Sequence, residues 1–368
     1  MESVEQERLK QFGDRVVPVL AVKYNMPTTL ADIARALGVS KMTVSRAINN
    51  HSEISAETRS RILETAQKMN YRPNQHARAL TTNRSYLFGI VVPDLMHSYF
   101  AEICRGVESV AREVGYQNLI CNTDEDAAKE IGELEALLPR TDGLIVAPAA
   151  TPEDTKFYRR ILAEGAQVVF IDRRLDGVRC PIVTTDDVEV GKIATEHLIR
   201  LGHRKIGFLR GTQASTALDR FEGYRKALAN HKIPVNVKLI RECGFTERNG
   251  YEAMTTWIKE GTVPPAIFAA NDPAAIGAMS ALFEAGMKVP DDVAIVGAGN
   301  IHYGDMLRIP ITTVSWSKIE MGQAAANLLI QLIEGEEKKQ KLQNVLVKPE
   351  LLIRESCGAT RYKTKVRA

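Results

Sequence analysis

Cysteine is scarce in this 368-residue chain, and its five cysteines are scattered: Cys104, Cys121, Cys180, Cys243 and Cys357. The sequence has no Cys-x-x-Cys pair and no cluster of cysteine with histidine, so we expect neither a disulfide framework nor a metal site. No apolar run approaches the roughly 18 residues that span a bilayer, and the short run at 16–22 follows four acidic residues, unlike a signal peptide. These absences predict a cytoplasmic protein without a membrane partner.

Motifs of common enzymes are also missing. The sequence contains no G-x-S-x-G, H-E-x-x-H or Walker A motif, and scattered histidines such as His203 form no recognisable triad. The segment VGAGNIHYG resembles the start of a dinucleotide-binding fingerprint, but His302 stands at its third glycine position, and no acid-ended second strand has the required spacing. We therefore predict a protein that is not an enzyme and has no cofactor.

The charge is low overall but unevenly distributed. The formal net charge of the chain is +3. Residues 28–85 contain nine Lys or Arg against four Asp or Glu, a net charge of +5 that leaves −2 for the rest. A compact basic module on a slightly acidic body suggests a polyanion partner for that module alone, whereas the alternative is an ordinary solvated surface.

The basic module begins with a pattern of three short helices. Gly38 ends the first helix as a C-cap would, and Ser40 and Ser55 are suitable N-caps for the second and third. The residues expected to face inward follow helical spacing: Leu30, Ile33, Ala34 and Leu37, then Val44, Ala47 and Ile48, then Ile62, Leu63, Ala66 and Met69. Three short helices with a tight turn between the first two form a helix-turn-helix layout.

The second helix of this layout carries residues suited to reading DNA. In a helix-turn-helix this helix enters the major groove with its N-terminal residues at the base edges. Lys41 and Arg46 can donate to guanine, and Met42 can contact a thymine methyl. Residue types that bind phosphate oxygens accompany them: Thr43, Ser45 and Asn49. Each alone is equally consistent with a solvent-facing polar residue, but together with the basic bias they predict DNA binding.

From Tyr86 onward, short apolar runs alternate with helical patterns. The runs typical of buried strands are YLFGIVV, QNLIC, DGLIVA, QVVFID, KIGFLRG, AIFAAND and VAIVGAG. Strands alternating with helices predict βαβ units and parallel sheets that are covered on both faces. About 270 residues of this pattern exceed what one such domain needs, so two lobes are expected.

The segments TLADIARALGVSKMTVSRAINN, ISAETRSRI and NYRPNQHARAL resemble the DNA-binding end of the lactose/galactose repressor (LacI/GalR) family of bacterial transcriptional regulators. The resemblance continues through VVPDLMHSYFAEICRGVESVAREVGY, VVFIDRR, HLIRLGHRKIGFLRG, RFEGYRKAL, FAANDPAAIGAM and LLIRES, and so covers about residues 28–358. It implies an α/β architecture in which an all-α helix-turn-helix headpiece precedes a two-lobed, periplasmic-binding-protein-like domain with parallel sheets.

The function that this resemblance implies is ligand-responsive, sequence-specific regulation of transcription. Such proteins bind a palindromic operator in double-stranded DNA as dimers, and a small-molecule effector controls their affinity. We expect a repressor of a carbohydrate-related operon. The tail at 358–368 has no Leu or Ile with which to form the leucine heptads of a tetramer, which favours a homodimer. The alternative is a small-molecule binding protein without a DNA-binding role, which would need a secretory signal and no headpiece.

The resemblance also implies a division into domains. They are an N-terminal extension (1–27), the headpiece (28–72), a hinge helix and linker (73–85), an effector-binding and dimerisation domain (86–358) and a basic tail (359–368). Within the effector domain we expect the first lobe at about 86–185 and 316–342, and the second lobe at about 186–315 and 343–358.

Matched to the family position by position, the DNA-binding residues fall into three groups. The base-reading positions are Lys41, Met42 and Arg46, and the phosphate-contacting positions are Thr29, Thr43, Ser45 and Asn49. In the hinge helix, Ala77 and Arg78 line the minor groove, and Leu80 matches the leucine that wedges between central base pairs. Such an apolar wedge unstacks a flexible base step and widens the groove. The alternative for Leu80 is packing against a lobe.

The effector site is expected between the two lobes, where the strands of such domains end. By resemblance, the effector-contacting residues are Tyr99, Phe100, Asp172, Arg220 and Asn271. Local roles are the alternative, with Asp172 capping a loop and Arg220 paired with an acid. Gly299 also lies at an effector position, where family members commonly carry an acidic residue. The missing carboxylate makes an anionic effector easier to accept, so we predict a sugar acid or sugar phosphate.

Overall fold

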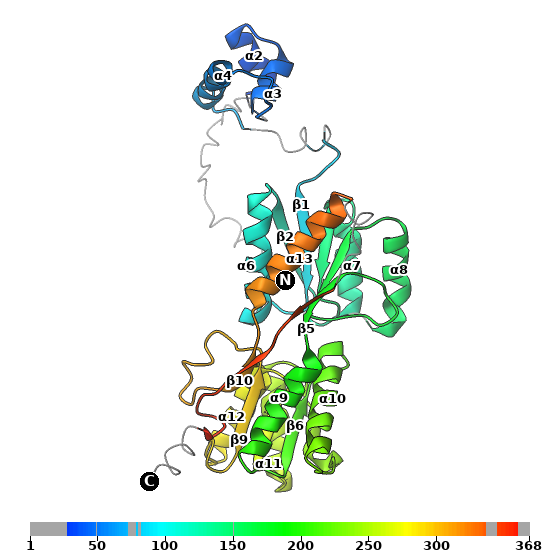
Figure 1. The fold of residues 1–368 in the computed structure, drawn as a ribbon, viewed down its shortest axis with the longest axis vertical. Coiled ribbons are helices and arrows are strands. Elements are labelled where there is room, and N and C mark those ends of the chain that lie inside the picture. The colour runs from blue at the N-terminus through cyan, green and yellow to red at the C-terminus, as the bar shows by residue number, and fades with distance from the viewer. Residues whose placement is uncertain are drawn as a thin grey trace, which may run out of the picture. The chain divides into compact units, whose positions relative to one another are not determined.

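The computed structural model of the chain (Figure 1) describes residues 28–48, 50–72, 79, 82–149, 151–335 and 344–359. The chain divides into two compact units, residues 1–82 and 83–368. The expected N-terminal extension at 1–27 lies outside the described residues, and so do residues 360–368 of the expected tail. Within the described ranges no helix is long and apolar enough to cross a membrane.

The described part of the headpiece consists of three helices: α2 (Leu30–Leu37), α3 (Lys41–Ile48) and α4 (Ala56–Lys68). The predicted caps are confirmed. Gly38 ends α2 with a left-handed φ of 67°, which glycine adopts without strain. The Ser40 side chain accepts a hydrogen bond from Thr43 N at 3.0 Å, and the Ser55 side chain accepts one from Thr58 N. The three helices therefore begin and end where the sequence pattern predicts.

All three helices contribute to a small headpiece core. Its buried residues are Ile33, Ala34, Val44, Ala47, Ile62 and Ala66. Leu63, which helical spacing predicts to face inward, is 46% exposed instead. The buried stripe of α4 runs through Ile62 and Ala66, four residues apart on one face, so the residue after Ile62 turns toward solvent. The prediction for Leu63 is therefore wrong.

The described strands of the second unit form two six-stranded sheets, one in each lobe. The first sheet has the order β11-β5-β4-β3-β1-β2, with parallel pairing between described neighbours. Its strands are β1 (Leu87–Val92), β2 (Gln117–Asn122), β3 (Gly143–Val146), β4 (Val168–Ile171), β5 (Ile182–Thr185) and β11 (Val345–Val347). Two helices cover each face: α6 (Ser98–Glu113) with α13 (Lys318–Ile333), and α7 (Ala127–Leu137) with α8 (Thr155–Ala163).

The second sheet has the order β12-β10-β9-β8-β6-β7, and only its described pair β10–β12 is antiparallel. Its strands are β6 (Ile206–Arg210), β7 (Ile240–Glu242), β8 (Ala266–Ala269), β9 (Ala294–Ala298), β10 (Thr312–Ser315) and β12 (Glu350–Leu352). Two helices again cover each face: α9 (Asp187–Arg200) with α10 (Ser215–Asn230), and α11 (Glu247–Glu260) with α12 (Asp272–Glu284). The predicted α/β fold with parallel sheets is confirmed.

In the described segments the chain crosses between the lobes three times, each time after a strand ends. It passes from β5 into α9, from β10 into α13, and from β11 into β12. The second lobe was expected to resume at residue 343, and this boundary is wrong. Val345–Val347 still belongs to the first lobe, because it pairs with β5 in the first sheet. There β11 covers backbone groups of β5 that would otherwise form an unpaired sheet edge. The second lobe therefore resumes after residue 347.

Within the described ranges, three helix pairs approach each other through facing glycines. The pairs are Gly106 with Gly322 (α6 and α13), Gly191 with Gly223 (α9 and α10), and Gly250 with Gly277 (α11 and α12). A Cβ atom at any of these six positions would lie 1.8 to 2.3 Å from a backbone carbonyl oxygen of the partner helix. Any side chain would therefore force the two helices apart.

Replacing Gly250 with Ala should destabilise the second lobe. The new Cβ would lie 2.0 Å from the carbonyl oxygen of Ala274, and overpacking of this kind costs about 1–3 kcal/mol or more. Gly132→Ala is the matched control, because Gly132 lies on the exposed side of α7 with nothing within 4 Å of its Cβ position. It should stabilise the helix by about 0.5–1 kcal/mol. Urea unfolding followed by circular dichroism measures both changes, and equal midpoints for the two variants would contradict the packing argument.

Candidate functional site

The predicted base-reading residues lie on the exposed side of α3. Val44 and Ala47 on the opposite side are buried in the headpiece core, whereas Lys41, Met42 and Arg46 are exposed. Met42 has 63% of its area exposed although its side chain is apolar. An unbranched apolar side chain between two cations can contact a thymine methyl while its neighbours donate to guanine. This face of α3 therefore has the composition that major-groove reading requires.

Two of the four predicted phosphate-contacting residues, Thr29 and Thr43, have local partners at the starts of helices. The Thr29 hydroxyl donates to the Asp32 carboxylate at 2.7 Å as part of the capping box of α2. The Thr43 hydroxyl lies 2.8 Å from that of Ser40, and Ser45 is half-buried. Asn49 and the hinge residues lie outside the described residues: Ala77, Arg78 and Leu80.

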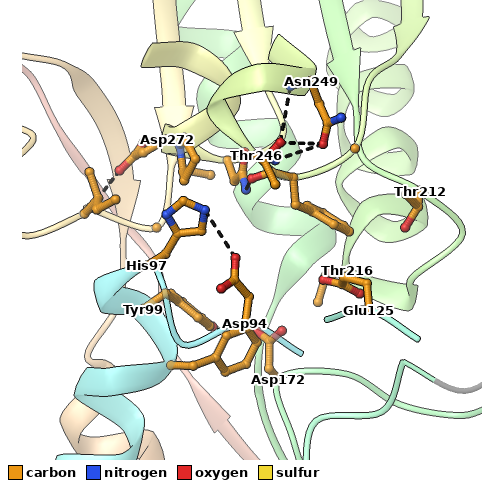
Figure 2. A pocket seen from close by; sticks show the side chains of 18 of the residues that line it. Asp94, His97, Tyr99, Glu125, Asp172, Thr212, Thr216, Thr246, Asn249 and Asp272 are labelled. Carbon is orange, nitrogen blue, oxygen red and sulfur yellow. Dashed lines mark hydrogen bonds and ion pairs between the residues drawn. The ribbon is translucent and has the colours of Figure 1, made fainter. Parts of the chain in front are cut away.

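A cavity of about 350 Å³ lies between the two lobes (Figure 2). It is lined by all six of the predicted effector residues, Tyr99, Phe100, Asp172, Arg220, Asn271 and Gly299. The first three belong to the first lobe and the last three to the second. Most of them directly follow the carboxyl ends of β4, β8 and β9 or lie in the helix after β1. Parallel pairing brings these strand ends to one edge of each sheet, and the two edges face each other.

Asp172 forms the first-lobe wall together with Tyr99. The Tyr99 hydroxyl donates to the Asp172 carboxylate at 2.5 Å and accepts a hydrogen bond from Trp316 Nε1 at 3.1 Å. Asp172 has a left-handed φ of 65°, an uncommon conformation for a residue with a side chain. Burial raises the pKa of Asp172, although Arg173 and Arg220 oppose the shift. The carboxylate is therefore held in the cavity wall by a strained backbone and a tyrosine.

Arg220 forms an ion pair in the second-lobe wall. Its Nε donates to the Asp187 carboxylate at 2.7 Å, its Nη1 donates to the Ala270 carbonyl at 2.7 Å, and its guanidinium lies 5.1 Å from the centre of the Trp316 ring. Burial raises the pKa of Asp187 to about 7 despite Arg220. Arg220 therefore pairs with an acid, as the alternative interpretation of the sequence expected. Its side chain also lines the cavity.

The backbone after β8 and β9 completes the second-lobe wall. Asn271 is the N-cap of α12: its side chain accepts from Ala274 N at 3.0 Å and donates to the Phe245 carbonyl at 2.7 Å. After β9, the buried ammonium of Lys318 donates to the carbonyls of Gly299 at 3.0 Å and of the next residue at 2.9 Å. Lys318 belongs to α13 of the first lobe, so it joins the lobes beside the cavity.

The sequence prediction missed this lysine. Lys318 follows the N-cap of α13, where the helix dipole favours acids. A cation in that position is the signal that could have identified it.

Several residues that line the cavity itself were also missed. Arg173 donates to both carboxylate oxygens of Glu125, at 2.6 and 2.7 Å, and lies 5.1 Å from the centre of the Phe245 ring. His97 Nε2 lies 3.3 Å from the Asp94 carboxylate and 3.6 Å from the Glu247 carboxylate of the second lobe. Arg173 directly follows Asp172 at the end of β4, so the rule that strand ends meet at the cavity could have included it.

The cavity combines acidic, hydroxyl and aromatic side chains. Its carboxylates include Asp94, Asp124, Glu125, Asp172 and Asp272, its hydroxyl groups include Thr212, Thr216 and Thr246, and its aromatic rings include Phe100, Phe245 and Trp316. Both lining guanidiniums already have carboxylate partners. Among the described residues no group of three or more His, Cys, Asp or Glu is placed to hold a metal ion. Such a lining suits a small molecule with several hydroxyl groups and a flat apolar face.

Comparison with known proteins gives two matching family models. Residues 29–74 match the model of bacterial regulatory proteins of the lacI family, and residues 195–357 match that of the periplasmic binding protein-like domain. The chain is 34% identical over 334 residues to the HTH-type transcriptional repressor PurR of Haemophilus influenzae, covering 89% of this chain and 98% of the relative. It is 35% identical over 334 residues to the HTH-type transcriptional regulator DegA of Bacillus subtilis, covering 90% and 98%.

Solved structures that resemble this chain are also transcriptional regulators. The lac repressor dimer bound to operator and the anti-inducer ONPF matches with a TM-score of 0.80 and 28% identity, covering 90% of this chain and 99% of that chain. The complex of the transcriptional regulator CelR with cellobiose matches with a TM-score of 0.67 and 28% identity, covering 89% and 99%.

Replacing Arg220 with Met should make stability depend more steeply on pH above neutrality. The pKa of Asp187 rises from its ordinary value of 3.8 to about 7 in the fold. Protonated Asp187 therefore stabilises the fold, and this contribution is lost as the pH rises from 3.8 through the folded pKa. Removing Arg220 raises that folded pKa further, so the loss continues to higher pH, by at most about 1.4 kcal/mol per pH unit.

Urea unfolding at pH values of about 6, 7 and 8.5 measures this effect. The destabilisation of Arg220→Met relative to the unmodified protein should grow with pH across that range. Arg248→Met is the matched control, because Arg248 pairs with Glu252 at the surface, where its side chain is 86% exposed. A destabilisation of Arg220→Met that is the same at every pH would contradict the assignment.

Proposed function

Because the chain belongs to the LacI family of bacterial regulatory proteins, we propose that α3 of its headpiece reads a palindromic operator and that the cavity between its lobes binds the effector that controls this reading. Members of the family are transcriptional regulators and not enzymes, and they act as dimers. One observation carries the proposal. The chain that exposes Lys41, Met42 and Arg46 on a capped helix also places all six predicted effector residues around one cavity.

We assign base reading to Lys41, Met42 and Arg46. Support comes from their exposure on one face of α3 and from the caps that fix the start of this helix. We assign phosphate contacts to Thr29, Thr43, Ser45 and Asn49. Thr43 belongs to the first turn of α3, where backbone N–H groups also favour an anion.

We propose further that residues 73–85 form the hinge that joins the headpiece to the effector domain. In this proposal Ala77 and Arg78 line the minor groove, and Leu80 wedges between central base pairs. Two subunits related by two-fold symmetry would present two such hinges to one operator, so the two half-sites carry the same sequence on opposite strands. Support for the hinge comes from the similarity to PurR, which covers 89% of this chain and so includes residues 73–85, whereas the lacI family model ends at residue 74.

The charges in the cavity bear on the class of effector. The prediction of a sugar acid or sugar phosphate rests on the carboxylate that is missing at Gly299. Two observations oppose it: the lining includes several carboxylates, and Arg173 and Arg220 are already paired with Glu125 and Asp187. An added anion would have to displace the exposed carboxylate of Glu125 or the buried carboxylate of Asp187, and displacing Asp187 leaves a buried charge uncompensated. We therefore propose an uncharged polyhydroxylated effector, and the acidic derivative becomes the alternative.

Arg46→Ala should weaken operator binding by roughly 10- to 100-fold, because a bidentate contact to guanine contributes about 1–3 kcal/mol. The probe is a duplex selected from a randomised library by the unmodified protein, and gel shift measures its affinity. Arg225→Ala is the control, since Arg225 is an exposed arginine of α10 in the other unit. Failure of the unmodified protein to select any duplex would support the alternative of a small-molecule binding protein without a DNA-binding role.

A thermal-shift screen against neutral sugars, sugar acids and sugar phosphates tests the effector class. A ligand at 100 times its Kd adds about 2.7 kcal/mol to the free energy of unfolding, enough to raise Tm by several degrees. We expect the largest shifts with neutral compounds and smaller shifts for Thr216→Val, which removes a buried hydroxyl from the lining without changing its shape. Stabilisation by acids or phosphates alone would refute the uncharged effector.

A further inference from the structure

The turn between α3 and α4 places a carboxylate against one of the proposed base-reading side chains. Glu53 Oε2 lies 2.5 Å from Arg46 Nη1. Both groups are open to solvent, with 64% of the Glu53 side chain and 45% of the Arg46 side chain exposed. Arg46 belongs to the last turn of α3, and Glu53 follows it by seven residues. The ion pair therefore lies on the surface of the headpiece, at the helix proposed to enter the major groove.

The turn that carries Glu53 is held on both sides. His51 N donates to the Arg46 carbonyl at 3.0 Å, and Ile54 N donates to the His51 carbonyl at 3.3 Å. Arg59 of α4 donates to the same His51 carbonyl at 2.5 Å and to the Ile54 carbonyl at 3.3 Å. The Ile54 side chain packs against the headpiece core. The backbone thus presents Glu53 to Arg46 from a fixed position.

The other acids of the headpiece have different surroundings. Asp32 closes the capping box of α2, Glu57 lies in the first turn of α4, and Glu64 accepts a hydrogen bond from Ser60 at 3.1 Å. Each of them carries the same charge as Glu53 in the same small unit. Glu64 therefore provides a control that changes the charge of the headpiece equally but does not face Arg46.

Stability does not explain a carboxylate at this position. An ion pair between exposed side chains adds little to the stability of the fold. Near DNA, the carboxylate of Glu53 repels phosphates whatever their sequence, so it weakens binding to all duplexes. The Glu53–Arg46 ion pair therefore neither strengthens DNA binding in general nor adds much to the stability of the headpiece. Its effect must be on the Arg46 guanidinium.

The effect on Arg46 is one of orientation. A guanidinium has five N–H donors in a fixed planar fork, and Glu53 occupies one of them at Nη1. Its other donors have no partner among the described residues and can make the bidentate contact to guanine O6 and N7. A side chain that is already restrained loses less conformational entropy when it binds.

We propose that Glu53 is a positioning residue that holds Arg46 in the orientation for reading its base. It raises sequence discrimination because it directs Arg46 to one base, whereas its repulsion of phosphates lowers the affinity for all duplexes alike. This inference rests on the proposed base-reading role of Arg46.

The test compares the full-length protein with Glu53→Gln, Glu64→Gln and Arg46→Ala on a randomised duplex library, followed by sequencing of the bound fraction. Affinities for one selected duplex and one random-sequence duplex are titrated alongside. Glu53→Gln and Glu64→Gln each remove one negative charge, so both should bind the random duplex about 2- to 5-fold more tightly. Only Glu53→Gln should lower the selected-to-random affinity ratio, by about 5- to 10-fold, and relax the base preference at the position that Arg46→Ala relaxes.

Glu53→Asp separates charge from position. It keeps the negative charge but shortens the reach to Arg46, so the ratio should fall while affinity for the random duplex stays unchanged. An unchanged ratio for Glu53→Gln, matching Glu64→Gln, would overturn the proposal, and so would a higher ratio, which would mean that Glu53 competes with DNA for Arg46. If Arg46→Ala leaves every base preference intact, the base-reading role of Arg46 fails first.

Discussion

Parallel pairing of strands is the constraint on which the effector cavity depends. Within each sheet it brings the carboxyl ends of the parallel strands to one edge, and the described crossings between lobes all start at such ends. The two edges therefore face each other, and residues far apart in the sequence meet there. Tyr99 and Trp316, 217 positions apart, are joined by a 3.1 Å hydrogen bond. Because the walls consist of the segments that follow the strands, the lining can vary while the sheets stay unchanged.

Burial of charge governs what the cavity can bind. Asp187 and Arg220 are withdrawn from water and compensate each other's charge, whereas the buried carboxylate of Asp172 accepts a hydrogen bond from Tyr99. A ligand in this site competes with these internal partners, so its binding energy includes the rearrangement of their hydrogen bonds. Several partners lie on opposite lobes: Lys318 of α13 binds the backbone after β9, and His97 faces Glu247. A ligand that alters such contacts binds two lobe arrangements with different affinity, which is the requirement for effector control.

In the headpiece the side chains proposed to bind are exposed, whereas the charged groups of the cavity are buried. Its core is small, and most of its specificity lies in exposed side chains of α3 whose positions are set by caps and turns. Met42 is exposed without any structural need, and Arg46 is paired with Glu53 at the surface. These features contribute little to folding. They are typical of a surface that binds another molecule. On such a surface the orientation of each side chain, rather than its burial, determines what it can contact.

The sequence by itself determined the elements and the kind of site. Gly38, Ser40 and Ser55 act through local backbone geometry, so the headpiece helices could be predicted, as could the alternation of strands and helices in the lobes. Tertiary structure decided the rest. Leu63 faces solvent because the helix stripe that packs is set by neighbouring helices, β11 belongs to the first sheet because of its partner, and the facing glycines become necessary only when two helices meet. The partners of Arg220, Arg173 and Arg46 likewise depend on distance in space, since ion pairing and burial act between residues that no local pattern connects.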